Sequence, residues 1–410
     1  MTYKKNILHF TNCFVADKGI LSNRDLWVDV ENGIIIDKPQ ITDDYIEVNL
    51  EGKIIVAGFM DIQINGCFGL DYSTVFDCVS EKEQFIQEYN NTMQKMVQYG
   101  VTSICPTVTS SFSDVYKDVL PIVGSKTRSS ERTDSLGAHL EGPFISRQKK
   151  GCHPPETLDT MQAGYKSVLM RYGSNFADYT AIITAAPEVQ NVIQTMKDVL
   201  DKHPNIVYSI GHTMSDFDTG VQAIESGGTM MTHLFNAMPP FTARNPGVIG
   251  LIDLPNTYKN IDTPYYGLVA DGIHVHPSAI KLAYNLNPDK AILVTDAMSL
   301  IGLPDGSYIR GTSKNQEQQK IVKIGHRLLL QNTETIAGSA THLLDCVKNL
   351  MKWTGVPLEK ALVTITNNPS KSLNLQASKG FLDIGCDADL VILDSNTDIS
   401  MVYKLGHKVL

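Results

Sequence analysis

The sequence predicts an α/β protein: a (β/α)8 TIM-like barrel with a small β-sandwich domain built from both chain ends. Eight short apolar, β-prone runs alternate with helical patterns between residues 54 and 297, which is typical of a parallel barrel. The chain ends instead carry short strands with alternating polarity, as in antiparallel sheets. We expect residues 1–56 and 375–410 to form the discontinuous sandwich and residues 57–374 to form the barrel.

The hydrophobic patterns predict the elements in chain order. Before residue 54, short runs such as 26–30 and 33–36 predict antiparallel strands. The barrel strands are expected at residues 54–65, 101–108, 134–141, 179–188, 205–213, 228–236, 266–272 and 290–297, several of them apolar on both faces. Helical spacing is found at residues 81–99, 157–172, 190–202, 215–226, 341–354 and 357–366. A last strand at 385–394 is expected to join the N-terminal strands.

The composition agrees with a soluble enzyme and favours a reducing compartment. The chain has 35 basic and 44 acidic residues, a net charge of −9, without a basic patch interleaved with aromatic residues; we expect no nucleic-acid partner. It has no apolar run of 18 residues, and its first ten residues lack the apolar segment of a signal peptide, so we expect no membrane partner. Seven scattered cysteines without a C-x-x-C pair favour free thiols and a cytoplasmic location.

Four ionisable residues stand where predicted barrel strands end. Glu141, His212, His233 and Asp296 close the third, fifth, sixth and eighth runs. The carboxyl ends of barrel strands meet on one face, where catalytic groups gather. Two histidines and a glutamate can hold a catalytic metal, and a separate aspartate can act as acid and base. The set predicts a metal-assisted hydrolase.

Other polar residues near these ends have simpler interpretations. His274 and His276 form an H-x-H that could bind metal, although such loop histidines more often face substrate. His153 and Arg244 lie in polar loops and could be ordinary loop residues, and Cys152 could be a small loop residue. Their residue types alone assign none of them a role.

The motifs around these residues resemble those of the amidohydrolase superfamily and, within it, the N-acetylglucosamine-6-phosphate deacetylase family. The runs THLFNAM at 232–238 and LEGPF at 140–144 are the most specific. The resemblance extends over nearly the whole chain, through residues 58–66, 139–144, 211–213, 270–274, 294–297 and 387–391. It implies hydrolysis of N-acetyl-D-glucosamine 6-phosphate to D-glucosamine 6-phosphate and acetate, in amino-sugar metabolism.

One departure from the superfamily pattern concerns the metal. Many amidohydrolases carry H-x-H at the end of the first strand and a carboxylated lysine that bridges two metals. Here Gln63 and Asn65 occupy the first-strand positions, and amides are poor zinc ligands. We therefore expect one divalent metal ion per subunit, with Zn²⁺ favoured, held by Glu141, His212 and His233.

The resemblance also implies catalytic and substrate-binding roles. Asp296 would take a proton from the metal-activated water and deliver it to the leaving nitrogen, and His153 would stabilise the oxyanion. Arg244 and His274 would bind the phosphate, with Arg244 reaching the neighbouring active site of a homodimer. The implied substrate-binding residues are Cys152, His153, Asn236, Ala237, Arg244, Asp271, His274, Ile336, Ala337 and Gly338.

Two alternatives remain open at this point. The chain could be another amidohydrolase-superfamily amidase, such as a cyclic amidase or a dihydroorotase, but those types usually carry the H-x-H and the bridging lysine. It could instead be a catalytically silent barrel that serves as a binding protein. Silence would normally show as a lost ligand or a lost acid, whereas Glu141, His212, His233 and Asp296 are all present.

Overall fold

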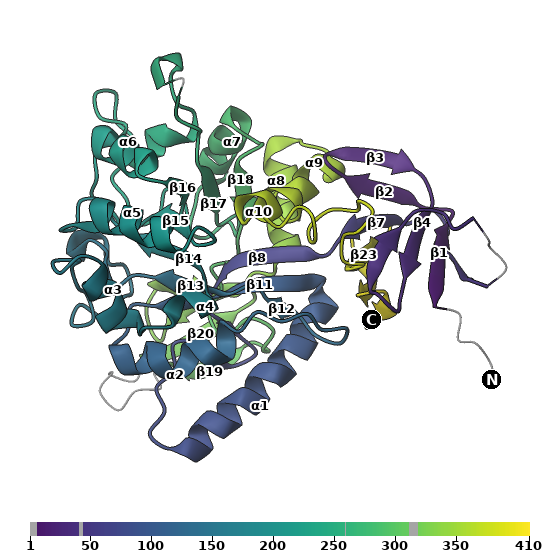
Figure 1. The fold of residues 1–410 in the computed structure, drawn as a ribbon, viewed down its shortest axis with the longest axis horizontal. Coiled ribbons are helices and arrows are strands. Elements are labelled where there is room, and N and C mark those ends of the chain that lie inside the picture. The colour runs from purple at the N-terminus through teal and green to yellow at the C-terminus, as the bar shows by residue number, and fades with distance from the viewer. Residues whose placement is uncertain (1–5, 41–43, 259, 311–318) are drawn as a thin grey trace.

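Eight parallel strands form the barrel in the order in which they occur along the chain (Figure 1). They are β8 (Phe59–Ile64), β11 (Val101–Thr109), β13 (Ala138–Glu141), β14 (Thr180–Ala185), β15 (Val207–Ile210), β16 (Gly228–Met231), β17 (Tyr265–Leu268) and β18 (Ala291–Leu293). Backbone hydrogen bonds connect the segment after β18 with the end of β8: the amide of Asp296 donates to the carbonyl of Gln63, and the amide of Asn65 donates to the carbonyl of Ala297, both over 2.9 Å. The predicted barrel is confirmed.

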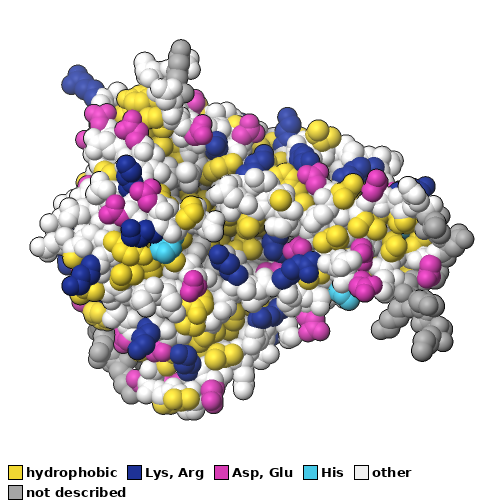
Figure 2. Space-filling view, in the orientation of Figure 1, with side chains coloured by type: hydrophobic (Ala, Val, Ile, Leu, Met, Phe, Trp, Pro, Cys, Tyr) yellow, Lys and Arg dark blue, Asp and Glu magenta, His cyan; other side chains and the backbone are white. Residues whose placement is uncertain are grey.

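The computed structural model describes residues 6–40, 44–258, 260–310 and 319–410. The described part excludes residues 1–5 and 41–43, which belong to the segment predicted to form the sandwich. The prediction about a signal peptide concerned residues 1–10, and the first five of these are not described. Within the described ranges, no helix is both long enough and apolar enough to cross a membrane. The seven cysteines are all described and are free thiols. Basic and acidic side chains are mixed on the face drawn in Figure 2.

The helices follow the predicted pattern with shifted ends. They are α1 (Val79–Met96), α2 (Ser113–Val123), α3 (Tyr165–Tyr172), α4 (Phe176–Tyr179), α5 (Val192–Lys202), α6 (Phe217–Glu225), α7 (Pro277–Leu286), α8 (Leu343–Thr354), α9 (Leu358–Val363) and α10 (Asn367–Ser372). The prediction of a helix from residue 157 was wrong: α3 begins only after Gly164, whose φ of +60° is not helical. The sequence analysis did not identify α2, α4, α7 or α10.

Several predicted strand boundaries were also wrong. The run 54–65 is two strands, because β7 (Ile54–Ala57) belongs to the sandwich; they part at Gly58, where a Cβ would lie 2.1 Å from the Thr102 side chain. The run 134–141 divides at Gly137, whose φ is +108°, into β12 (Asp134–Ser135) and β13. The strands predicted over 205–213, 228–236 and 290–297 end at Ile210, Met231 and Leu293. His212, His233 and Asp296 therefore lie in the loops that follow their strands.

Two sheets form the sandwich, as predicted: one contains N-terminal strands alone, and the other combines strands from both chain ends. One sheet has the order β5-β4-β1-β6 and the other β25-β24-β23-β7-β2-β3. The strands are β1 (Ile7–Thr11), β2 (Phe14–Asp17), β3 (Ile20–Asn23), β4 (Leu26–Asp29), β5 (Ile34–Ile36), β6 (Ile46–Asn49), β23 (Leu390–Leu393), β24 (Ile399–Lys404) and β25 (His407–Lys408). C-terminal β23 pairs with N-terminal β7. Phe10 and Val28 of one sheet share a buried cluster with Ile55 and Ile392 of the other.

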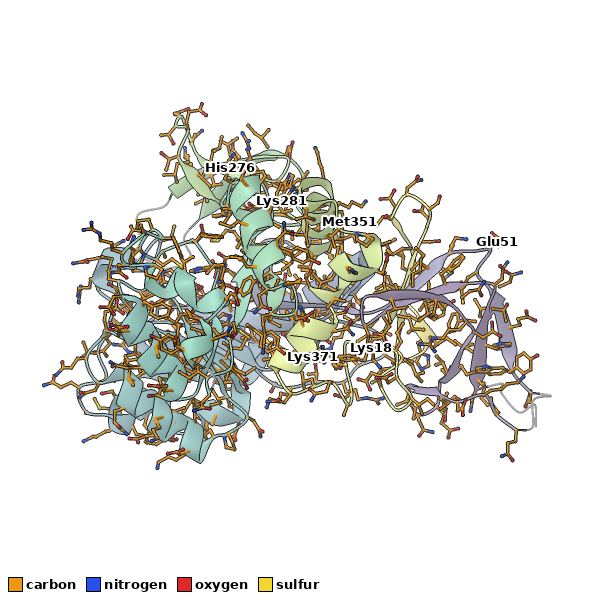
Figure 3. All side chains as sticks on the ribbon, turned by 90° about the horizontal axis from the view of Figure 1, so that it is seen from above. Lys18, Glu51, His276, Lys281, Met351 and Lys371 are labelled. Carbon is orange, nitrogen blue, oxygen red and sulfur yellow. The ribbon has the colours of Figure 1, made fainter. Side chains whose placement is uncertain are left out.

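A buried charge cluster joins the sandwich to the barrel. Lys404 on β24 is fully buried and donates to Asp134 of β12 over 2.7 Å and to Asp389 over 2.9 Å. Lys379 donates to Asp134, Asp387 and Asp389 over 2.8–3.1 Å. Because each ammonium is shared among carboxylates, the buried charges compensate one another. Lys18 and Lys371, both labelled in Figure 3, each lie over the ring of Phe381.

The sequence analysis missed an antiparallel sheet inserted between β18 and α8. It consists of β19 (Gly306–Arg310), β20 (Gln319–Ile324), β21 (Arg327–Leu330) and β22 (Ile336–Ser339), paired in chain order. A further small hairpin, β9 (Gly66–Cys67) and β10 (Leu70–Asp71), follows the first barrel strand. Both additions lie after barrel strands and contribute side chains to the cavity described next.

Candidate metal centre and catalytic cavity

Glu141, His212 and His233 meet at the carboxyl ends of the barrel strands. The Oε1 atom of Glu141 lies 3.2 Å from Nε2 of His212 and 3.0 Å from Nε2 of His233. The two Nε2 atoms are 2.9 Å apart. All three residues are buried. The structure thus brings together the three residues predicted as metal ligands.

The chemistry of this donor set fits a divalent metal. The Nδ1 atom of His212 lies 2.7 Å from the carbonyl oxygen of Lys149, which can only accept, so the imidazole proton is on Nδ1. Whenever the ring is neutral, its lone pair is therefore on Nε2, the atom that meets the other two donors; metal-binding histidines are oriented in this way. Burial opposes ionisation of Glu141, but the hydrogen bonds and charges of His212 and His233 hold its pKa well below the usual value. Two imidazoles and one carboxylate form a His₂Glu set with room for further ligands.

Three of the predicted site residues share an unusual backbone conformation. His212, His233 and Asp296 have φ values of +48°, +29° and +46°. Residues other than glycine rarely adopt this left-handed region, and such strain is concentrated at functional sites. Each residue follows the end of a barrel strand by two or three positions. The strain supports a functional origin for these turns.

The side chains predicted at the first strand hold the carboxylates by hydrogen bonds. Gln63 donates Nε2–H groups to Glu141 over 2.9 Å and to Asp296 over 3.4 Å, and Asn65 donates to Oδ1 of Asp296 over 2.7 Å. Burial and the negative charge of Glu141 raise the pKa of Asp296. A carboxylate with a raised pKa, beside a metal-ligand cluster, suits a group that accepts and returns a proton.

His153 is held in one tautomer by the loop after β11. The backbone amide of Ser110 donates to Nδ1 of His153 over 3.2 Å, and the Ser110 hydroxyl lies 2.7 Å from the same atom. Burial and the neighbouring His212 lower the pKa of His153 to about 3. A neutral ring whose Nδ1 accepts must carry its proton on Nε2. His153 therefore lines the cavity as a neutral hydrogen-bond donor.

His274 and His276 differ in position and role. His274 lines the cavity, and its Nδ1 lies 2.6 Å from the Asp271 carboxylate. Burial opposes protonation, but the hydrogen bond and charge of Asp271 raise the pKa of His274. His276 is exposed and caps α7, since its Nδ1 accepts from the amide of Ser278. Only the first histidine of the H-x-H motif belongs to the cavity.

A cavity of about 410 Å³ contains the metal-ligand cluster, Asp296 and most of the predicted substrate contacts. Those contacts are Cys152, His153, Asn236, Ala237, His274, Ile336, Ala337 and Gly338. Asp271 acts through His274 and does not line the cavity. Arg244 lies on an exposed segment outside it. The lining residues not predicted from the sequence are Asp71, Thr109, Gly151, Ile273 and Met298. Gly151, Ile273 and Met298 lie one or two residues from predicted site residues, which was an available signal. Asp71 and Thr109 are placed by strand pairing, which the sequence does not show.

Comparisons with known proteins agree with this architecture. Residues 54–409 match the family model described as the amidohydrolase family. The N-acetylglucosamine-6-phosphate deacetylase of Caenorhabditis elegans is 36% identical over 98% of this chain and 94% of that protein. The enzyme of the same name from Homo sapiens is 35% identical over 98% and 95%. The crystal structure of the N-acetylglucosamine-6-phosphate deacetylase from Pasteurella multocida superposes with a TM-score of 0.82 at 26% identity, over 98% of this chain and 99% of the other.

Proposed function

The chain belongs to the amidohydrolase family, and we propose that it removes the acetyl group from N-acetyl-D-glucosamine 6-phosphate. The products are D-glucosamine 6-phosphate and acetate, which places the reaction in amino-sugar metabolism. The observation that carries the proposal is that Glu141, His212, His233 and Asp296 converge in one cavity, in a chain similar over nearly its full length to deacetylases of this substrate.

One divalent metal ion per subunit, Zn²⁺ in our proposal, would be held by Glu141, His212 and His233. When bound, such an ion polarises an amide carbonyl and lowers the pKa of water. Gln63 and Asn65 add no imidazole to the site and instead donate hydrogen bonds to Glu141 and Asp296. That arrangement supports a mononuclear centre.

Asp296 is the acid and base of the proposed reaction. As a carboxylate it takes the proton of the attacking water at Oδ, and as an acid it returns that proton to the departing nitrogen. The return matters because an unprotonated amine is a poor leaving group. The hydrogen bond from Asn65 fixes Oδ1 of Asp296, so that the second carboxylate oxygen is the one that handles the proton.

His153 stabilises the negative oxygen that forms on the attacked carbonyl carbon. Its Nδ1 is occupied by the Ser110 amide, so its Nε2–H is the donor that can reach the oxyanion. A neutral donor held in place before the reaction needs no reorganisation as charge develops.

The 6-phosphate is recognised by positive charge at the cavity rim. His274, whose protonated form is favoured by Asp271, contributes one contact. Arg244, which lies outside the cavity of its own chain, contributes the other in our proposal, from a neighbouring subunit of a homodimer. The main chain and side chains at 236–237 and 336–338 bind the sugar. We also propose that the enzyme works in the cytoplasm. In the proposed domain division, residues 1–56 and 375–410 form the sandwich domain and residues 57–374 form the barrel domain.

The test is acetate release from N-acetylglucosamine 6-phosphate by protein whose metal content has been measured, with N-acetylglucosamine as the control. We expect rapid turnover of the phosphorylated sugar and slow turnover of the control. Hydrolysis of a cyclic amide or of dihydroorotate instead would identify a different amidohydrolase. Binding of the phosphorylated sugar without turnover, by metal-loaded protein, would indicate a silent binding barrel.

A further inference from the structure

Four buried polar side chains form a continuous hydrogen-bonded chain inside the barrel, beside the metal-ligand cluster. The hydroxyl oxygens of Ser209 and Thr232 are 2.6 Å apart, and those of Thr232 and Thr184 are 2.7 Å apart. Thr184 Oγ1 lies 2.7 Å from Nε2 of His139, whose Nδ1 lies 3.1 Å from the carbonyl oxygen of Ile62. None of the four side-chain residues is more than 2% exposed. The mechanism proposed above uses none of them.

The carbonyl at one end fixes the direction of every bond in this chain. A carbonyl can only accept, so in the neutral imidazole of His139 the ring proton is on Nδ1, and Nε2 accepts from the Thr184 hydroxyl. The single hydroxyl proton of Thr184 is then used, and its oxygen must accept from Thr232. By the same reasoning Thr232 accepts from Ser209. Every hydrogen bond from Ser209 to the carbonyl of Ile62 therefore has the same donor-to-acceptor direction. Such a fully satisfied network favours one arrangement of the strands that carry these residues.

Three members of this hydrogen-bonded chain lie within three residues of a site residue in the sequence, and the fourth, Thr184, is paired with Glu141 between β14 and β13. His139 is two residues before Glu141 on β13, and Thr232 immediately precedes His233. Ser209 is three residues before His212, and Ile62 immediately precedes Gln63, which donates to Glu141. Gly211 leaves room for this network: a Cβ there would lie 2.8 Å from the side chains of both Thr184 and Thr232. This chain of hydrogen bonds thus links the strand ends that carry Gln63 and the three proposed metal ligands.

We propose that this chain, which we call the His139 relay (Ser209, Thr232, Thr184 and His139), positions Glu141, His212 and His233 for metal binding. The inference rests on the proposed function, because it takes these three residues as the ligands. Metal affinity is sensitive to small displacements of its ligands, and the loss of outer hydrogen-bonding partners typically costs 10–100-fold in affinity. The relay residues are positioning residues, since none of them is a proposed ligand or substrate contact.

The test compares Thr184→Val with two controls, one at the same residue and one at another residue of the same strand. Thr184→Ser keeps the hydroxyl. Thr180→Val removes a different buried hydroxyl of β14, which donates to the carbonyl of Phe176 over 2.7 Å at the opposite end of the strand. The measurements are the Zn²⁺ dissociation constant by chelator competition, the Tm of the metal-free protein, and kcat and KM.

We expect Thr184→Val to weaken Zn²⁺ binding about tenfold or more, Thr184→Ser to retain binding within about threefold, and Thr180→Val to lower Tm without weakening Zn²⁺ binding. Equal Zn²⁺ affinity for Thr184→Val and wild type would overturn the proposal, even if Tm fell. If Thr184→Val does not fold, the pair Thr232→Val and Thr232→Ser gives the same comparison. Wild-type protein that binds no Zn²⁺ would contradict the proposed function itself, whereas tight wild-type binding that no relay variant changes would contradict only this inference.

Discussion

The side-chain amide of Asn65 donates to Oδ1 of Asp296 over 2.7 Å, at a position where many amidohydrolases carry a metal-binding histidine. The contact joins the end of the first barrel strand to the loop after the last. It stabilises the carboxylate form of Asp296 and partly offsets the burial and the Glu141 charge, which raise its pKa. In our proposal, Asn65 therefore helps to set the pKa of Asp296, the proposed base.

Asn65→Ala should move the acid limb of the pH–rate profile upward. Without the donated hydrogen bond the carboxylate form of Asp296 is less favoured, so the pKa of Asp296 rises. As the pH is lowered, kcat/KM therefore begins to fall at a higher pH than in the wild type. One hydrogen bond to a charged group corresponds to a shift of about one pH unit. The profile of kcat/KM against pH measures it, with the basic limb as the internal reference. An unchanged acid limb would show that another group controls it.

Asp296→Asn should abolish most turnover while the metal stays bound. Asparagine has nearly the same shape but cannot accept the proton of the attacking water, so kcat should fall at least ~10² -fold. Metal content and kcat are measured on the same preparation. Near-normal turnover would assign the base elsewhere, with His274 as the next candidate because it lines the same cavity.

Elemental analysis should find about one tightly bound metal ion per chain. His212→Ala or His233→Ala should lose it, because two protein ligands rarely retain a catalytic metal. His276→Ala is the matched control, since this exposed histidine caps α7 and lies outside the cavity. Two metal equivalents, both required for activity, would contradict the mononuclear centre.

The site could be predicted from the sequence because its main residues stand at strand ends with specific motifs around them. The last residue of each strand could not be predicted. His212, His233 and Asp296 follow their strands in left-handed backbone conformations, and hydrophobic patterns do not indicate such turns. The inserted sheet that contains β22 was missed because its short segments lack the alternation with helices that revealed the barrel. Asp71 and Thr109 reach the cavity through strand pairing, and only tertiary structure shows this.

The charge cluster at the domain junction should make stability depend on Lys404. Lys404→Met leaves the buried carboxylates of Asp134 and Asp389 with less compensation and should cost about 3–5 kcal/mol in free energy of unfolding at pH 7. Lys408→Met, at an exposed position of β25, should cost little. Urea denaturation measures both. Similar small losses in the two variants would contradict a structural role for the cluster.

The same cluster predicts a loss of stability in acid. Burial alone would raise the pKa of Asp389, but the charges of Lys379 and Lys404 lower it to about 2. Because the folded pKa is below the unfolded value of about 3.9, this contribution is complete above about pH 4 and is lost as the pH falls toward 2. In Lys404→Met this part of the acid dependence should be smaller. Parallel pH dependences of wild type and variant would show that Lys404 does not set this pKa.

Arg244 tests the identity of the substrate and the subunit arrangement together. If its guanidinium binds the 6-phosphate, Arg244→Ala should lower kcat/KM for N-acetylglucosamine 6-phosphate about ten- to a hundredfold. The rate with N-acetylglucosamine, which lacks the phosphate, should barely change. Arg244→Lys should recover only part of the loss, because an ammonium lacks the planar pair of donors. Equal losses on both sugars would show that Arg244 is structural.

Mixing subunits then decides whether Arg244 acts across an interface. In a heterodimer of Arg244→Ala and Asp296→Asn chains, the Arg244→Ala subunit keeps its base and receives the intact arginine of its neighbour. One complete composite site should form, so the mixture should regain activity that neither variant has alone. Acetate release from the mixed and the separate proteins measures this. If mixing restores nothing although heterodimers form, Arg244 acts within its own chain and not across the interface.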